Sequence, residues 1–303
     1  MKFEVTILGS SSATPVFNRN PTAQLLNCNE KFYLIDCGEG TQQQLIKFGL
    51  KASKIDMVFI SHLHGDHYFG LIGLLSTMHL NGRIKPFLIF GPAPLKEILE
   101  IQFKYSDTHL KYELQFFEIE ADVSRVIYEN TDIIVETIIL NHRIPTTGFK
   151  FTERKRLRKI LIDKLEEDNI QPDLYPLLKK GLDLTLPSGK VLLNKDYTID
   201  SDTPKCYCYC SDTKADGSYL DTIKGCSTLY HEATFLDDLL ERANVTHHTT
   251  ALQAGRVAEE VKAGKLIIGH FSSRYKTLLP LLDEAASVFP ECVLAIEGET
   301  FSI

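Results

Sequence analysis

The sequence lacks any run of about 18 consecutive apolar residues, and it does not open with a basic segment followed by an apolar one. A membrane-spanning helix needs roughly 20 predominantly apolar residues, and a secretory signal needs the basic segment as well as the apolar one. The chain instead starts with MKFEVTILG, which alternates like a strand. We therefore expect a soluble, cytoplasmic protein with no membrane partner.

Positive charge is also not in excess. The formal net charge is −7, whereas proteins that bind polyanions are more often basic. The distribution is uneven, because residues 150–180 contain nine basic and six acidic side chains. Residues 151–190, interrupted by three prolines, are either a solvated insertion or a basic arm that grips a polyanion. Composition leaves both interpretations open.

The seven cysteines form no C-x-x-C pair, and their number is odd. Cys206, Cys208 and Cys210 alternate along an expected strand and therefore share one face. One interpretation is that this C-x-C-x-C segment binds a metal. We favour core packing, because buried reduced thiols behave as small hydrophobic side chains, and reduced thiols fit a cytosolic setting.

No short repeat is visible, and the length of 303 residues suits one large domain or two modest ones. Apolar runs predict strands alternating with amphipathic helices in both halves, which indicates a layered α/β fold. We expect strands near 3–8, 22–27, 32–36, 56–60, 87–90, 113–118, 125–128, 132–140, 205–211, 227–230, 265–269 and 292–297. We expect helices near 40–48, 68–80, 94–105, 235–243, 251–263 and 274–288.

Residues 61–67 read Ser-His-Leu-His-Gly-Asp-His, directly after an apolar strand. Neutral imidazole and ionised carboxylate are the ligands that zinc and neighbouring metals prefer. Residues this close in sequence cannot all surround one ion. The motif therefore indicates two metals, or one metal and a base.

Three further candidate ligands follow expected strands: His142, Asp212 and His270. Strand ends are where α/β folds assemble sites, since rigid strands can aim several loops at one point. Two other polar clusters are HEAT at 231–234 and His247-His248-Thr249-Thr250. In the second, a threonine is positioned to cap the following helix, so a cap beside a surface histidine is the alternative to a functional role.

Taken together, these motifs resemble the ribonuclease Z family of the metallo-β-lactamase superfamily. The resemblance runs along almost the whole chain, through LIDCGEGTQQQL (34–45), SHLHGDH (61–67), NHRIPTTGF (141–149), SDT (211–213), HEATF (231–235), HHTTALQA (247–254) and GHFSSRY (269–275). It implies a four-layer αβ/βα sandwich in a single domain, 1–303. It also implies that 151–190 is an inserted, flexible tRNA-binding arm and that the protein is a homodimer.

The resemblance implies two zinc ions per subunit, although the same ligands accept manganese or iron. His62, His64 and His142 would hold one ion, Asp66, His67 and His270 the other, and Asp212 would bridge them. Catalysis would use Asp66 as proton acceptor and Glu232 with His248 as the pair that protonates the leaving oxygen. The implied reaction is hydrolytic removal of the 3′ trailer from precursor tRNA, which leaves a tRNA 3′-hydroxyl and a trailer with a 5′-phosphate.

Substrate contacts are expected from three segments. The loop PVFNRN (15–20) matches a family loop that senses the tRNA 3′ end, with Phe17 in place of the family's lysine. The residues that we expect to bind substrate are Arg19, Asn20, Arg154, Lys155, Arg156, Arg158, Lys159, Ser272 and Arg274.

Two other functions fit parts of the pattern. The metal motif and the acidic net charge also suit another hydrolase or phosphodiesterase of the superfamily that acts on a small molecule. A metal-binding or degenerate RNA-binding protein without catalysis is less favoured, because all seven ligand positions are filled.

Overall fold

A computed structural model describes residues 2–303 and divides them into two compact units. Unit 1 comprises the chain up to Thr152 and from Cys206 onward, and unit 2 comprises Glu153–Lys205. Unit 2 therefore continues past the expected end of the arm at residue 190. Within residues 2–303, no helix combines the length and the apolar character needed to span a bilayer.

The first sheet of unit 1 has seven strands in the order β18-β1-β2-β3-β4-β5-β6. β18, β1, β2 and β3 pair antiparallel, and β3 to β6 pair parallel. The strands are β1 (Phe3–Gly9), β2 (Ala23–Cys28), β3 (Lys31–Ile35), β4 (Ile55–Phe59), β5 (Phe87–Gly91), β6 (Leu114–Glu118) and β18 (Thr300–Ser302).

The second sheet also has seven strands, in the order β17-β16-β15-β14-β9-β8-β7. β14 to β17 pair parallel, β9 runs antiparallel to β14, and β7 runs antiparallel to β8. The strands are β7 (Val126–Glu129), β8 (Ile133–Leu140), β9 (Thr146–Glu153), β14 (Cys206–Cys210), β15 (Thr228–Glu232), β16 (Leu266–Gly269) and β17 (Cys292–Leu294).

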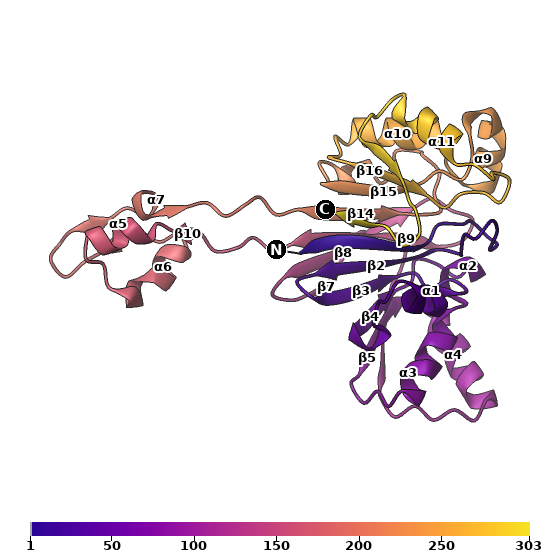
Figure 1. The fold of residues 1–303 in the computed structure, drawn as a ribbon, viewed down its shortest axis with the longest axis horizontal. Coiled ribbons are helices and arrows are strands. Elements are labelled where there is room, and N and C mark those ends of the chain that lie inside the picture. The colour runs from indigo at the N-terminus through magenta and orange to yellow at the C-terminus, as the bar shows by residue number, and fades with distance from the viewer. Residues whose placement is uncertain (1) are drawn as a thin grey trace. The chain divides into compact units, whose positions relative to one another are not determined.

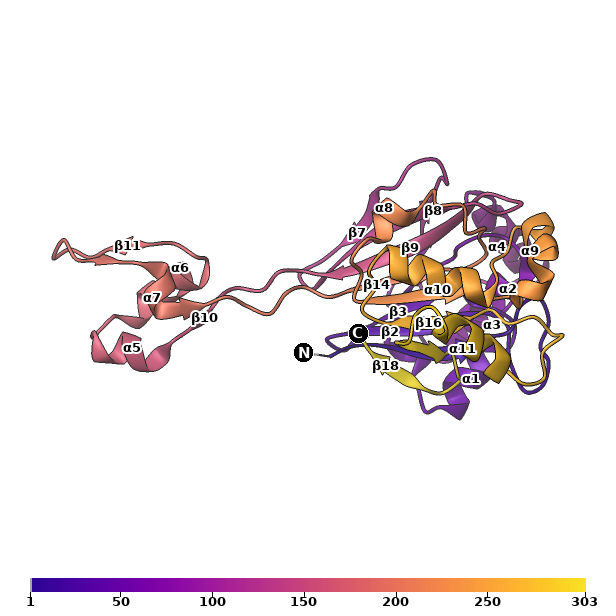
Figure 2. The ribbon, with the colours of Figure 1, turned by 90° about the horizontal axis from the view of Figure 1, so that it is seen from above.

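Helices cover the outer face of each sheet, as Figures 1 and 2 show. Those beside the first sheet are α1 (Thr41–Lys47), α2 (Gly65–Tyr68), α3 (Leu71–Leu80) and α4 (Pro94–Tyr105), with a 3₁₀ turn η1 (Ala52–Lys54). Those of the second half are α8 (Leu220–Ile223), η3 (Asp237–Leu239), α9 (Leu240–Thr246), α10 (Ala251–Glu260) and α11 (Leu279–Ala286).

Three apolar clusters lie between these layers. One lies between the sheets, where Phe59 of the first sheet meets Phe149 and Phe151 of the second. The others fill the two helix–sheet interfaces. Two sheets with helices outside them form the expected αβ/βα four-layer sandwich, which is confirmed. Cys208 and Cys210 lie in the second helix–sheet cluster, so core packing of these thiols is confirmed.

Two strands of unit 1, β9 and β18, are absent from the set expected from the sequence. β9 begins at Thr146, inside NHRIPTTGF, and lies within the second sheet. Proline and glycine are typical of turns, so Pro145 and Gly148 conceal this strand in the sequence. A Cβ on Gly148 would lie 2.3 Å from the Tyr209 carbonyl oxygen, so close strand packing, not a turn, requires this glycine.

The second missed strand, β18, is short and pairs with β1 near the end of the chain. Two expected helices also start later than predicted. α9 follows a 3₁₀ turn, and α11 starts at Leu279 with a proline in its first turn.

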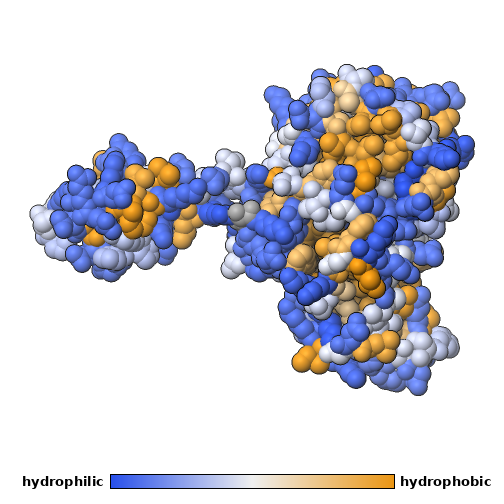
Figure 3. Space-filling view, viewed as in Figure 1, coloured by the Kyte–Doolittle hydropathy of each residue, from blue (hydrophilic) through white to orange (hydrophobic). Residues whose placement is uncertain are grey.

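Unit 2 has a small core of its own, formed by Leu165, Ile170, Leu178, Leu192 and Tyr197. Its elements are β10 (Lys159–Ile160), α5 (Ile162–Glu167), η2 (Pro172–Leu174), α6 (Tyr175–Lys179), β11 (Leu184–Thr185), β12 (Val191–Leu192), α7 (Asn194–Tyr197) and β13 (Thr198–Ile199). Its surface is mainly hydrophilic, with a patch of apolar side chains on the face seen in Figure 3.

Candidate metal centre

Seven candidate ligands converge in unit 1 from the ends of several strands. The segment after β4 carries His62 and His64, and the short helix α2 carries Asp66 and His67. The others follow β8, β14 and β16, as expected for sites at strand ends. They are His142, Asp212 and His270.

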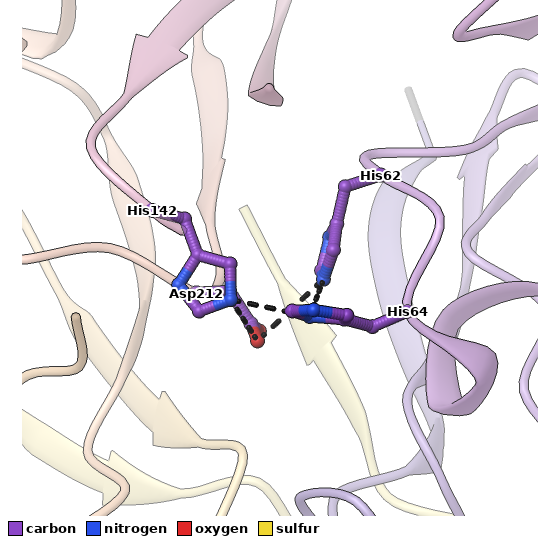
Figure 4. A group of neighbouring side chains, drawn as sticks. All are labelled: His62, His64, His142 and Asp212. Atoms are coloured by element: carbon purple, nitrogen blue, oxygen red, sulfur yellow. Dashed lines mark hydrogen bonds and ion pairs between the residues drawn. The ribbon is translucent and has the colours of Figure 1, made fainter. Parts of the chain in front are cut away.

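The first group consists of His62, His64, His142 and Asp212, whose ligand atoms all lie within 4.8 Å of one another (Figure 4). His64 Nδ1 lies 3.0 Å from His62 Nε2 and 3.2 Å from His142 Nε2. Asp212 Oδ2 lies 3.7 Å from Nε2 of both His62 and His142. These separations suit donors around a common ion, since zinc binds each of them at about 2.0–2.2 Å.

The second group consists of Asp66, His67 and His270, again within 4.8 Å of one another. Asp66 Oδ2 lies 3.6 Å from His67 Nε2 and 3.5 Å from His270 Nε2. The other carboxylate oxygen of Asp212, Oδ1, lies 3.2 Å and 3.1 Å from the same two nitrogens. Asp212 therefore offers one oxygen to each group.

The donor set fits a metal on a further observation. The Nε2 atoms of His67 and His270 are buried and have no hydrogen-bond partner among residues 2–303. A buried polar atom without a partner is costly, and a metal ion at these atoms would satisfy both. Unit 1 thus contains a buried His/Asp metal site.

A second layer of hydrogen bonds fixes the ring orientation of four of these histidines. Each presents Nε2 to the site and has Nδ1 held from behind, which is the usual support of a metal-binding imidazole. Nδ1 contacts Ser61 Oγ for His62 (3.0 Å), Asp36 Oδ2 for His67 (2.7 Å), the His247 carbonyl oxygen for His142 (2.9 Å) and Thr234 Oγ1 for His270 (3.0 Å). His64 is the exception, because its Nδ1 faces the site.

Three site residues lie one or two positions after a strand and adopt the left-handed conformation: Asp36 (φ 54°), Asp212 (φ 57°) and His270 (φ 57°). Such a conformation costs a non-glycine residue about 1–3 kcal/mol. It turns the chain sharply at the end of β3, β14 or β16, so that the side chain enters the site instead of continuing the strand pattern.

Burial and mutual charge set the ionisation of the ligands. Burial lowers the pKa of His62 well below its ordinary value and that of His142 to about 4, so both rings are neutral donors near pH 7. Burial alone would raise the pKa of Asp212, but the neighbouring His270, His67 and His62 hold it well below its ordinary value. These neutral rings and the ionised Asp212 are in the states that metal binding requires. His67 differs: burial lowers its pKa, but Asp212, Asp36 and Asp66 outweigh burial and raise the pKa well above its ordinary value, so metal binding at His67 would release a proton.

Glu232 and His248 form a buried pair beside these ligands. His248 Nδ1 lies 3.0 Å from Glu232 Oε1, and Glu232 also accepts bonds from the backbone amides of Thr213 and Thr249. Burial works against the charged imidazole, but Glu232 outweighs it and raises the pKa of His248 to about 9. His248 is therefore protonated near neutral pH and can donate a proton.

Thr234, the last residue of HEAT, connects this pair to the metal ligands. Its hydroxyl donates to Glu232 Oε2 and lies 3.0 Å from His270 Nδ1. His231, the first residue of the motif, instead bonds Tyr219 and the Glu232 carbonyl and is buried away from the ligands. HEAT thus contributes its glutamate and threonine to the site.

The expected threonine cap is present: Thr250 is the N-cap of α10 and forms a capping box with Gln253. His248, however, does not lie free on the surface, because it is largely buried against Glu232. The cap is therefore confirmed, and a functional role for His248 stays a prediction.

The ligands open on a cavity of about 420 Å³. Its lining includes His64, Asp66, Asp212, His248 and His270, together with Ser12, Ala13, Thr14, Pro15, Pro21, Glu39, Gly65, Phe69 and Arg143. The proton acceptor and proton donor predicted from the sequence, Asp66 and His248, therefore face one space with the ligands. Asp66 is held there by the backbone amide of Ala13 at 2.7 Å.

The expected substrate-binding residues of unit 1 differ in exposure. Arg19 is 8% exposed, and its guanidinium donates to the carbonyl oxygens of Ser272 and Tyr275. Ser272 is equally buried, Asn20 is half-buried and Arg274 is exposed. Arg19 thus ties the loop 15–20 to the segment of Arg274, and substrate contact by these residues stays a prediction.

In unit 2, the expected substrate-binding residues lie near its start. Arg158 and Lys159 pair with Asp200 and Asp202 at the surface. Lys155 and Arg156 are exposed, and Arg154 is half-buried. Surface ion pairs contribute little stability, so a phosphate can displace these carboxylates. RNA binding by unit 2 stays a prediction.

The sequence is similar over its full length to known ribonucleases. "Ribonuclease Z" of Cytophaga hutchinsonii is 48% identical over 304 aligned residues, which cover 100% of this chain and 97% of the relative. "Ribonuclease Z" of Bacteroides fragilis is 43% identical, with 100% and 99% covered. The family model described as "Anti-Pycsar protein Apyc1" matches residues 3–158.

Solved structures give the same picture of the fold. The human tRNase Z short form (ELAC1) superposes with a TM-score of 0.72 at 26% identity and 99% coverage of both chains. The metallo-β-lactamase fold protein YhfI of Bacillus subtilis superposes with a TM-score of 0.70 at 19% identity, with both chains covered completely.

Proposed function

The chain belongs to the ribonuclease Z family of the metallo-β-lactamase fold, and from this membership we propose that it removes the 3′ trailer from precursor tRNA. Residues 3–158 also fit the Apyc1 family model. It is a metal-dependent hydrolase. The observation that carries the proposal is the buried Glu232–His248 pair, whose His248 lines one cavity with the metal ligands. An imidazole that is protonated at neutral pH beside a metal site suits a poor leaving group such as the 3′-oxygen of a ribose, which must receive a proton.

We assign two zinc ions per subunit to this site. The first would be held by His62, His64 and His142, and the second by Asp66, His67 and His270. Each would also bind one oxygen of Asp212. When bound, two such ions lower the pKa of a shared water and neutralise charge on the phosphate. Manganese or iron would suit the same ligands.

The protein's own residues supply the proton transfers. Burial opposes ionisation of Asp66, but His67 and His270 hold the pKa of its carboxyl well below the ordinary value, so it is an ionised acceptor at neutral pH. It takes the proton of the attacking water. His248, oriented by Glu232, donates to the leaving 3′-oxygen, so the products are a tRNA 3′-hydroxyl and a trailer with a 5′-phosphate.

Unit 2 would act as the tRNA-binding arm, with Arg154, Lys155, Arg156, Arg158 and Lys159 contacting the phosphate backbone. Binding energy collected far from the reacting bond raises affinity for the long substrate without changing the chemical step. We further propose a cytoplasmic homodimer, which the family resemblance implies.

The direct test is to map the 3′ ends produced when the purified protein is incubated with precursor tRNA, with and without an encoded CCA. We expect one cut at the 3′ side of the acceptor stem, leaving a 3′-hydroxyl on the tRNA. Intact precursor in the presence of two bound zinc ions would refute the proposed substrate.

A small-molecule phosphodiesterase is the second candidate, because the metal motif and the acidic net charge also suit one. The Apyc1 family model matches residues 3–158. That match ends before Asp212, Glu232, His248 and His270, whereas the ribonuclease Z relatives span all four. Parallel assays on precursor tRNA and bis(p-nitrophenyl) phosphate separate the two. Catalytic efficiency confined to the small substrate would favour the second candidate.

A further inference from the structure

Arg143 is the one lysine or arginine among the residues described as lining the 420 Å³ cavity. Three carboxylates line the same cavity: Glu39, Asp66 and Asp212. An RNA strand that places its scissile phosphate at the metal ligands must also bring neighbouring phosphates past these carboxylates. Each such phosphate needs a cation, because contacts to phosphate supply most of the affinity for nucleic acid.

The Arg143 side chain is available for this purpose. It is exposed, and it makes no hydrogen bond or ion pair with any residue from 2 to 303. It follows His142, whose ring is fixed by the His247 carbonyl oxygen, so its backbone position is set by the metal site.

Arg143 also lines a second cavity, of about 500 Å³. Its lining includes Asn141, Pro145, Asp216 and Ser218. The exposed Pro145 offers apolar contact to a base, and Asp216 and Ser218 offer polar groups to ribose hydroxyls. The Asp216 carboxylate also disfavours a phosphate inside this second cavity, which places the phosphate at Arg143.

We propose that Arg143 binds the phosphate next to the scissile one and that the second cavity receives the nucleoside attached to it. The inference rests on the proposed RNA cleavage and adds a substrate subsite to it. Arginine suits this role because its planar guanidinium binds phosphate oxygens in pairs.

The test compares Arg143→Ala with Arg256→Ala, which removes the same charge from an exposed position on α10 outside both cavities. On precursor tRNA, R143A should lower kcat/KM by about 10- to 100-fold, as expected for a lost charge-assisted hydrogen bond. The slope of log kcat/KM against log salt should become shallower by about 0.7, the value for one phosphate contact on a single strand. R256A should change neither quantity.

Two further measurements keep the inference open to refutation. Bis(p-nitrophenyl) phosphate has no neighbouring phosphate, so its hydrolysis and the zinc content should be unchanged in R143A. A minimal precursor with an uncharged methylphosphonate on one side of the scissile linkage should be cut slowly by the wild type and no more slowly by R143A. Equal losses on both substrates, or lost zinc, would overturn the inference.

The two proposals fail in different ways. If the wild type does not cut precursor tRNA, the proposed function is wrong. If the wild type cuts and R143A matches R256A, only the assignment of Arg143 is wrong.

Discussion

The two units of the chain handle charge in opposite ways. In unit 1, Asp36, Asp212 and Glu232 are buried, and each has several fixed partners. In unit 2, ion pairs such as Arg158–Asp200 lie at the surface, where water and salt compete with them. Chemistry at a phosphate needs desolvated charges in fixed positions, whereas gripping a long polyanion needs exposed charges that can change partners.

Removing Asp212 tests the buried side of this comparison most severely. Asp212→Ala deletes both bridging oxygens and leaves His67 and His270 without their shared carboxylate. We expect zinc content to fall and turnover of both precursor tRNA and bis(p-nitrophenyl) phosphate to drop by more than about 10³-fold. Metal analysis and both assays check this result. Normal turnover with two zinc ions retained would contradict the bridging role.

Glu232→Gln separates proton donation from metal binding. p-Nitrophenolate departs without protonation, so the loss should be about 10²- to 10⁴-fold on precursor tRNA and small on the activated substrate. The charge of Glu232 raises the pKa of His248 to about 9. In the variant this pKa should fall toward its ordinary value near 6.5, since Glu232 makes the largest of the contributions that oppose burial.

The dependence of the cleavage rate on pH shows the direction of this change in the pKa of His248. The donor is active below its pKa, so the wild-type rate should decline as pH rises through about 9. In Glu232→Gln the decline should begin at lower pH, and an unchanged alkaline limb would show that another group donates the proton.

Removing unit 2 tests the role of its exposed charges. The two ends of the unit meet, because the backbone amide of Glu153 donates a hydrogen bond of 2.9 Å to the Lys205 carbonyl oxygen. Residues 154–204 can therefore be replaced by a short glycine-serine turn without breaking the pairing of β9 with β14. A deletion of 155–185 alone would leave Leu192 and Tyr197 of the small core behind.

We expect the replacement to raise KM for precursor tRNA by about 10-fold or more and to leave hydrolysis of bis(p-nitrophenyl) phosphate within about twofold of the wild type. Equal losses on both substrates would assign unit 2 a structural role. Circular dichroism and zinc content provide the control for folding of unit 1.

The smallest effect is expected at the boundary between the units. Cys206 begins β14 directly after Lys205. A hydrogen bond from Cys208 is the main cause that lowers the pKa of the Cys206 thiol to about 6, whereas burial acts in the opposite direction. Iodoacetamide should label Cys206 faster than the other cysteines, with a rate that rises through about pH 6 and is level above it. Cys206→Ser should remove this fast phase, and labelling that still rises above pH 8 would contradict the lowered pKa.

The parts of the fold and site that sequence predicts well are the parts encoded locally. SHLHGDH is one segment, and apolar runs mark most strands. β9 escaped prediction because Pro145 and Gly148 are typical of a turn in the sequence. Only the structure shows that Gly148 is required by the close approach of the Tyr209 carbonyl oxygen on the neighbouring strand. Asp36 and Thr234 escaped as site residues because their partners lie 31 and 36 positions away in the chain.

Arg143 escaped for a different reason. An arginine after a histidine carries no signal by itself. Its proposed role comes from being the one arginine or lysine among the described residues that line the 420 Å³ cavity. The ligand positions His142, Asp212 and His270 could be proposed because each follows a strand. The left-handed turns that bring two of them into the site have no sequence signature.

The position of unit 2 between two paired strands has a wider consequence. β9 and β14 are antiparallel neighbours, so the whole unit occupies the place of a hairpin loop. The entropy of closing a loop grows only slowly with its length, and the sheet itself joins the two chain ends. Unit 1 can therefore accept inserted domains of different size and affinity between β9 and β14. Replacing the inserted domain would change the substrate preference and leave the reaction unchanged.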